Sequence, residues 1–272
     1  ERLQARALSG VKNPDGPADP IIVHPDVRRM LLTTRAYVEG CRALSLWTAM
    51  QLDISHRHED AQQREAANDF IELITPVFKA FFTDMGYETA SMCQQVFGGH
   101  GYIQETGVEQ FVRDARIAQI YEGTNGIQAL DLVRRKLFIH EGRLPKRFFA
   151  QLQRDIDSHD GDEDSREFVQ PLADALQRLQ NLTDWLIAKA DGHPDELGAA
   201  SVDYLRIFAL TTLAWKWVKM GIAAKSQQDD FHAAKLATAR YFFSRLLPQI
   251  EGLDAVVRSG SARMMEFDEA HF

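Results

Sequence analysis

The chain has 272 residues, 45% of them hydrophobic and 26% charged, which is ordinary for a globular protein with a buried core. The formal net charge of -8 argues against a nucleic-acid partner, because no surplus of basic side chains is present to neutralise phosphates. Two cysteines far apart in sequence, Cys41 and Cys93, indicate buried thiols in a reducing cytoplasm.

Helical periodicity dominates the sequence and predicts an all-α fold. The first 20 residues are expected to begin as helix and then break into a loop rich in proline and glycine. The chain starts at Glu1 without a methionine, which suggests a fragment or a processed product. A long helix is expected after an N-cap at Asp26, and Thr75 followed by Pro76 predicts the start of another helix.

That helix is expected to end near Phe97, where the sequence GGHG follows. A short helix is predicted from Val108 to Ile117. Another is predicted to begin at Thr124, with its apolar side chains facing inward: Ile127, Leu130, Val133, Leu137 and Phe138.

The acidic stretch from Asp157, DSHDGDEDSRE, is the best candidate for a boundary between structural units. We therefore expect two helical domains, residues 1–145 and 146–272. Beyond the acidic stretch, helices are predicted near residues 167–189, 195–225 and 229–257. The middle one is rich in aromatic residues, which indicates a packed core helix. No apolar run approaches the ~20 residues of a membrane span, so no transmembrane segment is expected.

The stretch from Gln94 to Leu137 carries the chemically informative residues. Gly98, Gly99 and Gly101 cluster at a helix end, where the absence of Cβ atoms permits positive φ and close approach of a ligand. Further on, Glu122 precedes Gly123 and a helix start. A carboxylate at such a position can be a plain turn residue, or a general base that faces a bound substrate.

Other chemistries are disfavoured by context. The sequence GGHG lacks the preceding strand that a dinucleotide-binding motif requires. His100 has no second histidine or cysteine at ligand spacing, so no metal site is expected. No Ser-His-Asp order or glycine-serine elbow is present.

The same stretch contains Q-x-x-G-G-x-G, then R-D-A, then Y-E-G-T, and in this order the motifs resemble those of the acyl-CoA dehydrogenase family. The resemblance is dense over roughly 45 residues and extends more weakly to Arg2 and His140. The remaining residues resemble the additional helical domain of the longer bacterial members. The implied fold is the family's carboxyl-terminal helical bundle followed by this additional domain.

The resemblance implies an enzyme that oxidises an acyl-CoA thioester to a trans-2-enoyl-CoA with FAD as cofactor. Glu122 matches the family's catalytic base, which removes the proton α to the thioester carbonyl. Tyr121 and Gly123 match neighbours in the substrate pocket. Thr124 and Asn125 match positions at the flavin of the same subunit.

Further matches imply an oligomer. Gln95, Gly98 and Gly99 match a flavin-binding run that is reached from a neighbouring subunit, and Arg2 matches an arginine at a flavin pyrophosphate across the dimer interface. A homodimer is therefore expected, with an electron-transferring flavoprotein as electron acceptor. The motif around Arg2 departs from the family pattern, and Pro25 replaces a glutamine that often follows the histidine.

The R-D-A element, Arg113 and Asp114, is expected to form an internal ion pair. The family's amino-terminal helical domain and middle β-domain do not occur in this sequence, so the chain alone is expected to be inactive. Two alternatives remain open: a catalytically silent helical module for oligomerisation, and a flavoenzyme acting on another carbon acid such as a nitroalkane. Glu122 argues against both, since the second would favour aspartate there.

Overall fold

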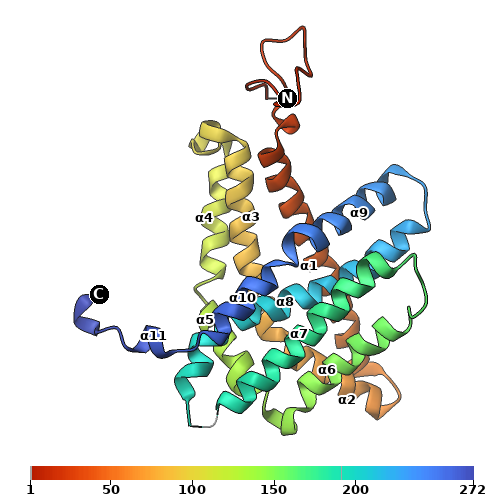
Figure 1. Ribbon diagram of the computed structural model, residues 1–272, viewed down its shortest axis with the longest axis vertical. Helices are drawn as coiled ribbons and strands as arrows, with labels where there is room; N and C mark the ends of the chain where they lie inside the picture. Colours follow the sequence, from red (N-terminus) through yellow and green to blue (C-terminus); the bar gives the residue numbers. More distant parts are fainter. Residues whose placement is uncertain (1, 191) are drawn as a thin grey trace.

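The computed structural model describes residues 2–190 and 192–272, and 79% of the chain is helical. Within these residues the only β-type pairing is an isolated antiparallel bridge between Leu3 and Pro20. The predicted all-α fold is therefore confirmed. Figure 1 shows α3 and α4 side by side, projecting away from the lower helices in the same direction as the amino-terminal part of α1.

The helices of the first half alternate with short irregular or π-helical turns. Their bounds are α1 Pro25–Arg57, α2 Ala61–Val77, the π-helix η2 Phe78–Phe82, α3 Thr83–Val96, α4 Val108–Ala118, α5 Asn125–Asp131 and the π-helix η5 Leu132–Lys136. The helix predicted at 108–117 is thus confirmed, as is the end of α3 before GGHG. The N-cap prediction at Asp26 is wrong, because His24 takes that place and Pro25 fills the first helical position, where its missing N–H costs nothing.

No helix begins at Thr75, contrary to the sequence-based prediction. Pro76 lies inside α2, where its side chain is buried, and the Thr75 hydroxyl donates to the Ile71 carbonyl at 2.7 Å. A proline inside a helix removes one hydrogen bond, and the widened π-turn of η2 directly follows. Burial of the neighbouring Ile74 and Val77 in the core stabilises the chain in this arrangement.

Residues 2–20 form an irregular loop rather than the expected helix start. The buried Asp19 carboxylate organises this loop by accepting backbone N–H groups from Ala7 at 2.8 Å, Lys12 at 2.8 Å and Asn13 at 2.6 Å. These bonds, the one from Ala7 first, hold the pKa of Asp19 below its usual range. The Asp19 carboxylate thus takes the place of the backbone carbonyls that would accept these N–H groups in a helix.

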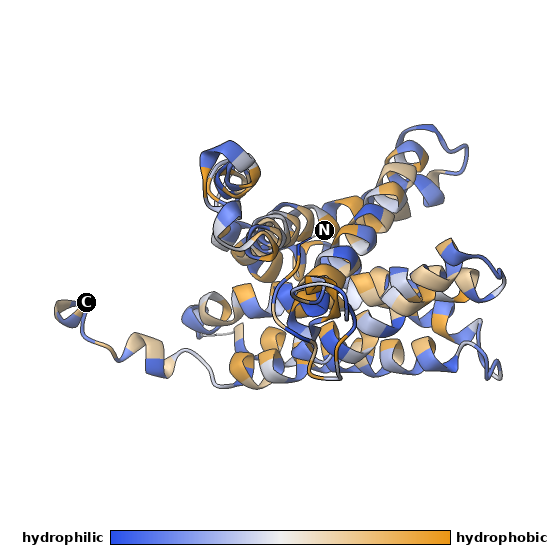
Figure 2. Ribbon diagram, turned by 90° about the horizontal axis from the view of Figure 1, so that it is seen from above, coloured by the Kyte–Doolittle hydropathy of each residue, from blue (hydrophilic) through white to orange (hydrophobic). Residues whose placement is uncertain are grey.

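The second half contains the longest stretch of buried chain. Its elements are α6 Ile139–Asp157, α7 Arg166–Ala190, α8 Pro194–Lys225, α9 Asp230–Tyr241, the π-helix η6 Phe242–Leu246, α10 Gln249–Arg258 and α11 Ala262–Met265. The three helices predicted beyond the acidic stretch are present, although the last is divided at η6. Figures 1 and 2 show that the segment after α10 extends away from the other helices.

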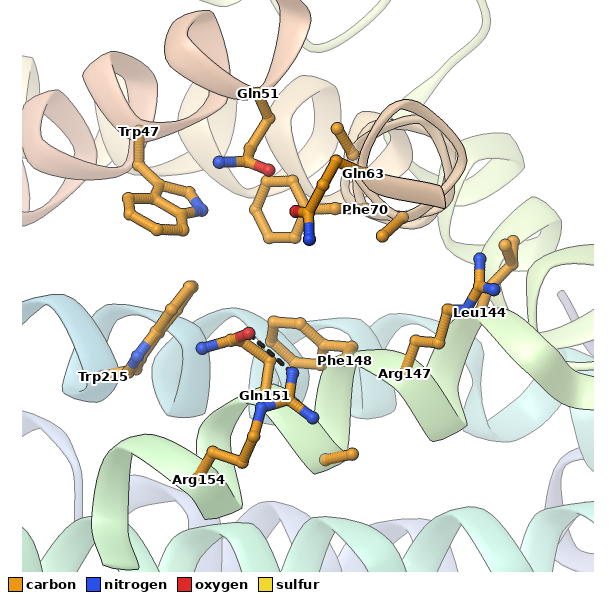
Figure 3. A pocket seen from close by; sticks show the side chains of 13 residues that line it. Trp47, Gln51, Gln63, Phe70, Leu144, Arg147, Phe148, Gln151, Arg154 and Trp215 are labelled. Carbon is orange, nitrogen blue, oxygen red and sulfur yellow. Dashed lines mark hydrogen bonds between the residues drawn. The ribbon is translucent and has the colours of Figure 1, made fainter. Parts of the chain in front are cut away.

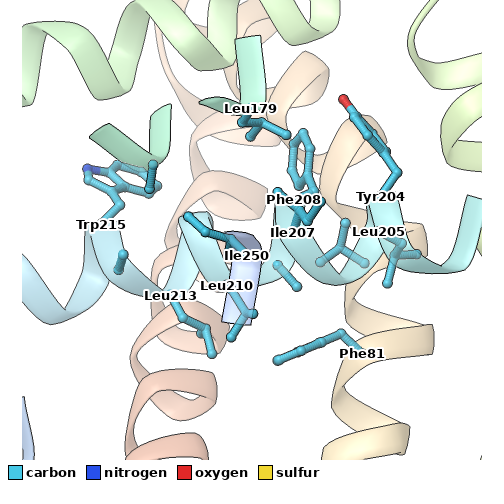
Figure 4. Close-up of a cluster of buried hydrophobic side chains, with 14 of the residues drawn as sticks. Phe81, Leu179, Tyr204, Leu205, Ile207, Phe208, Leu210, Leu213, Trp215 and Ile250 are labelled. Carbon is cyan, nitrogen blue, oxygen red and sulfur yellow. The ribbon is translucent and has the colours of Figure 1, made fainter. Parts of the chain in front are cut away.

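Helix α8 is the centre of the core. In Figure 4, Leu179 of α7 and Phe81 of η2 lie on opposite sides of it, and both are fully buried. Although the sequence indicated no membrane span, α8 is long and apolar enough to cross a membrane, but 72% of its most apolar window is buried within the fold. The apolar composition of α8 is explained by the other helices that pack around it.

One continuous cluster of buried side chains includes residues from both expected domains, from Ala36 to Val257. The chain passes from the first unit to the second through a kink at the start of α6, where His140, Glu141 and Gly142 all have positive φ. The division into residues 1–145 and 146–272 therefore describes two sequence segments that share one core.

Candidate active site

The loop Tyr121–Thr124 connects α4 to α5 and carries the predicted base. Glu122 is exposed and has a φ of +56°, and Gly123 follows with a φ of +75°. A left-handed conformation is uncommon for a residue with a Cβ atom and costs on the order of 1 kcal/mol. Such strain is found preferentially where a side chain must be presented in a fixed direction.

The backbone of this loop is held partly by side chains. Gln128 donates its amide to the Glu122 carbonyl at 3.3 Å, and a Cβ added at Gly123 would lie 3.0 Å from that same amide nitrogen. In the part of the chain that the structure describes, the N–H groups of Glu122 and Gly123 have no protein acceptor. Two donors therefore remain available beside the Glu122 carboxylate.

Thr124 is the N-cap of α5, as its sequence position predicts. Its hydroxyl accepts the Ile127 N–H at 3.4 Å. The Ile127 side chain, however, is 57% exposed, and Phe138 is 36% exposed, so the prediction that both face inward is wrong. The exposed Ile127 and the exposed Tyr121 flank Glu122 in sequence and give this surface apolar character.

Asn125 anchors the loop to the neighbouring helices. Its amide nitrogen donates to the Ala80 carbonyl at 3.1 Å and to Asp84 at 2.6 Å, and its amide oxygen accepts from Lys79 at 2.8 Å. The backbone N–H of Asn125 donates to the Gln119 carbonyl at 3.2 Å. Because these protein contacts occupy both ends of the side-chain amide, its evident role is to position the loop. The predicted flavin contact of Asn125 stays a prediction.

Lys79 is a residue of this site that the sequence analysis missed. It lies on η2, half-buried, and burial lowers its pKa, while the nearby carboxylates of Asp84 and Glu122 oppose that shift. The feature of the sequence that could have identified it is a single lysine inside the apolar run Val77–Phe82. Through its bond to Asn125, Lys79 places a positive charge near Glu122.

A second cluster of predicted residues lies at the end of α3. Arg2 donates from its guanidinium to the Phe97 carbonyl, although the two are 95 positions apart. Gly98 has a φ of +58°, and a Cβ there would meet a guanidinium nitrogen of Arg2. The positive φ favours glycine at this position, whereas the Arg2 guanidinium is the end of a flexible side chain that can move aside. Gly99 has open space around it, and Gln95 is exposed on α3.

The structure thus groups the predicted residues into two sets rather than one. Arg2, Gln95, Gly98 and Gly99 lie at one end of α4, and Tyr121–Asn125 lie at the other end. The 11 residues of α4 separate them by roughly 16 Å at 1.5 Å per residue.

The R-D-A element forms no internal ion pair. Arg113 pairs with Glu109 one turn earlier at 2.8 Å, and its side chain is 65% exposed. Asp114 accepts from Gln110 at 2.6 Å on the same surface. The helix places Arg113 and Asp114 on adjacent positions whose side chains diverge, so i,i+4 partners replace the expected pair. Among the described residues no group of histidine, cysteine and acidic side chains could hold a metal ion.

Two family models match most of the chain. Residues 2–137 match the family model "Acyl-CoA dehydrogenase, C-terminal domain", and residues 148–268 match "Acetyl-CoA dehydrogenase C-terminal like". The chain belongs to the acyl-CoA dehydrogenase family.

Within this family the chain is similar to several characterised members. It is 38% identical over 253 residues to the 3-methylmercaptopropionyl-CoA dehydrogenase of Ruegeria pomeroyi, with 91% of this chain and 42% of that protein covered. It is 31% identical over 289 residues to the broad-specificity linear acyl-CoA dehydrogenase FadE5 of Mycobacterium tuberculosis, with 100% and 47% covered. The chain thus spans less than half the length of these relatives.

Solved structures show the same fold. An acyl-CoA dehydrogenase from Bacillus anthracis complexed with FAD matches with a TM-score of 0.70 at 19% identity, over 95% of this chain and 45% of that one. The Caenorhabditis elegans protein ACDH-11 in complex with C11-CoA matches with a TM-score of 0.64 at 20% identity, over 97% and 42%.

Proposed function

We propose that this chain provides the base and part of the flavin contacts of an enzyme that converts an acyl-CoA thioester to a trans-2-enoyl-CoA. The observation that carries the proposal is Glu122, a strained and exposed carboxylate with free backbone N–H donors beside it. The family's relatives named above act on acyl-CoA thioesters, according to their names.

The Glu122 carboxylate would remove the proton from the carbon α to the thioester carbonyl. As this proton leaves, negative charge develops on the carbonyl oxygen, and an N–H donor placed at that oxygen stabilises it. The free N–H of Glu122 is suited to this task, and the bonds from Gln128 and Asn125 would hold the loop in register. The exposed apolar side chains of Tyr121 and Ile127 would line the acyl chain and exclude water.

The residues at the end of α3 fit a flavin dinucleotide. The exposed Arg2 guanidinium lies against Gly98, where its fork of donors suits a pyrophosphate, and the open space at Gly99 allows a ligand to approach the backbone. Gln95 adds an exposed amide on the same helix end, and Thr124 and Asn125 would face a flavin at the other end of α4. A bound FAD would supply the acceptor for the hydride that leaves the β carbon.

Glu122→Gln tests the proposed base. In a protein that carries the remaining domains, the glutamine keeps the shape of the side chain but cannot accept the proton. We expect flavin and acyl-CoA binding to persist while flavin reduction by the substrate slows at least about a thousandfold, about 4 kcal/mol in barrier. Stopped-flow absorbance of the flavin measures this rate.

Glu141→Gln is a matched control, because Glu141 is also an exposed glutamate with positive φ, at +57°, but lies at the start of α6. It should leave the rate unchanged. A Glu122→Gln enzyme that reduces its flavin at the parent's rate would place the base elsewhere, whereas a parent enzyme whose flavin no acyl-CoA reduces would favour the silent oligomerisation module.

Assembly and electron transfer are further parts of the proposal. Two separated sets of flavin residues on one chain support a homodimer in which each subunit contacts two flavins, and an electron-transferring flavoprotein as acceptor. We also propose that this chain alone neither retains FAD nor oxidises acyl-CoA. Absorbance near 450 nm in the purified chain would contradict the last point, and an active but strictly monomeric enzyme would contradict the dimer.

A further inference from the structure

A cavity of about 300 Å³ lies between α1, α2, α6 and α8, on residues that the proposed function does not use. Its floor is formed by aromatic rings, among them Trp47 and Trp215, whose centroids lie 5.3 Å apart at an interplanar angle of 78°. Phe70 and Phe148 extend the floor, as Figure 3 shows. Polar side chains surround the floor: Gln51, Gln63, Gln151, Arg147 and Arg154.

One donor on this wall has no partner. The indole N–H of Trp47 is buried and makes no hydrogen bond within the described residues. A buried donor without an acceptor costs about 1–3 kcal/mol, and because this nitrogen is closed off from the cavity, a ligand that brings an acceptor recovers that cost only when the indole ring turns towards it. The neighbouring Trp215 N–H, by contrast, is bonded to Asp155 at 2.5 Å.

The charges around the cavity favour an anion. Arg147 is already neutralised by Asp69 and by Glu65 at 2.7 Å. Arg154 is different: its guanidinium is bonded to the neutral Gln151 amide at 2.7 Å, and it has no carboxylate partner within the part of the chain described (Figure 3). Its charge is therefore available to a ligand.

A buried amine lies behind the aromatic floor and adds little to this positive charge at neutral pH, because burial lowers its pKa. The Lys216 Nζ is 3.7 Å from the centroid of the Trp47 ring and 3.1 Å from that of Trp215. The next lysine, Lys219, is paired with Asp155 at 2.7 Å. Among the residues that the structure describes, no acidic side chain lines the cavity itself.

We propose that this cavity binds a small amphipathic monocarboxylate. Its apolar body would lie on the rings of Trp47, Phe148 and Trp215, and its carboxylate would accept from the Arg154 guanidinium, and from the Trp47 N–H after the indole ring turns towards the cavity. At about 30 Å³ for each water-sized group, the volume holds about ten non-hydrogen atoms, the size of octanoate. Aromatic walls with few convergent polar groups are typical of small-molecule sites. The site shares no residue with the Glu122 loop, so it is independent of the proposed catalytic function.

Isothermal titration calorimetry with sodium octanoate tests the proposal on the 272-residue chain, whose helices share one continuous core. We expect saturable binding at one site, and binding of octan-1-ol weaker by at least about tenfold. Arg154→Met should weaken octanoate binding by about tenfold or more, about 1.4 kcal/mol. Arg42→Met is the matched control, since Arg42 is an exposed arginine of α1 outside the cavity lining, and it should bind like the parent.

A second variant and a spectroscopic signal locate the site. Ala150 is an exposed residue that lines the cavity, so Ala150→Leu should obstruct it without disturbing the core. In a ¹⁵N–¹H spectrum, octanoate should shift the Trp47 indole resonance downfield, assigned by its loss in Trp47→Phe, and leave that of Trp185 in place. Absence of saturable binding up to about 10 mM, equal affinity for octan-1-ol, or binding that neither variant alters would overturn the proposal.

Discussion

Lys216 shows how burial and aromatic contacts compete at a single side chain. The residue is only 3% exposed, and its Nζ has no hydrogen-bond partner within the described residues. Contact with two tryptophan rings favours the charged ammonium by about 2 kcal/mol. Desolvation of an ammonium costs several kcal/mol, and it dominates. Burial therefore lowers the pKa of Lys216 to about 6, with the charge of Lys219 acting in the same direction.

This balance gives Lys216 a predictable effect on stability. Its pKa is lower in the folded than in the unfolded state, so between pH 6 and about 10.5 the unfolded chain binds more protons and stability rises with pH. Lys216→Met should remove this rise and stabilise the chain at pH 7, by about 1–4 kcal/mol. Urea unfolding at pH 6.5 and 9 measures both effects.

Lys189→Met is the control, because Lys189 lies over the Trp185 ring at 5.8 Å but is exposed to solvent. It should change neither the stability at pH 7 nor its dependence on pH. A Lys216→Met variant less stable than the parent at every pH would show that the tryptophan contacts outweigh desolvation.

Substitution of Asn125 in the flavin-free chain tests whether its side chain stabilises the loop independently of any contact with flavin. If it anchors the loop, Asn125→Ala leaves Lys79 and Asp84 without the amide that joins them, and the flavin-free chain should lose about 1–3 kcal/mol of stability. Thermal unfolding of the chain without cofactor measures this loss. Asn181→Ala, at an exposed position of α7, should change stability by less than about 0.5 kcal/mol. Equal stability of both variants would refute the anchor.

At the scale of elements, Glu167 joins three helices at one end of the second half. From the first turn of α7 it pairs with Lys225 of α8 at 2.6 Å and with Arg240 of α9 at 2.8 Å. The hydrogen bond from Arg240, followed by the one from Lys225, lowers the pKa of Glu167 to about 2. Since the side chain is 34% exposed, solvent screening reduces what these pairs contribute to stability.

Glu167→Gln should therefore destabilise the chain by no more than about 1 kcal/mol at pH 7. Because the folded pKa lies below the unfolded one, the contribution of Glu167 is present above pH 4.5 and is lost as pH falls towards 2. The difference in Tm between parent and variant should shrink from pH 7 to pH 3.5. Glu163→Gln is the control, since Glu163 is 80% exposed and, in the described part of the chain, pairs only with Arg166 nearby in sequence. A constant difference across this pH range would contradict the prediction.

At the scale of the whole molecule, the shared core predicts cooperative unfolding. Helix α8 contacts α1 and α5 of the first half as well as α7, α9 and α10 of the second. If either segment unfolds, apolar side chains of α8 that pack against it become exposed to water. We expect one transition in urea, coincident by far-UV circular dichroism and by tryptophan fluorescence, with equal calorimetric and van't Hoff enthalpies. Two separated transitions would show that residues 1–145 and 146–272 are independent folding units.

The sequence by itself determined what local interactions control. The all-α fold, the end of α3 before GGHG and the Thr124 cap were predicted from residues a few positions apart, because helical periodicity and capping act over one or two turns. Glu122 was predicted from a motif whose spacing is equally local. The errors at Asp26 and Thr75 also concern helix ends, where a proline allows more than one outcome.

Only the tertiary structure decided the contacts between distant residues. The tertiary structure brings Arg2 to the Phe97 carbonyl, 95 positions away in sequence, and next to Gly98. It also brings Lys79 to Asn125, 46 positions away. It also kept Pro76 inside α2, because burial of the surrounding apolar residues offset the lost hydrogen bond. These outcomes depend on which helix faces pack together, and no periodicity within a single segment encodes that choice.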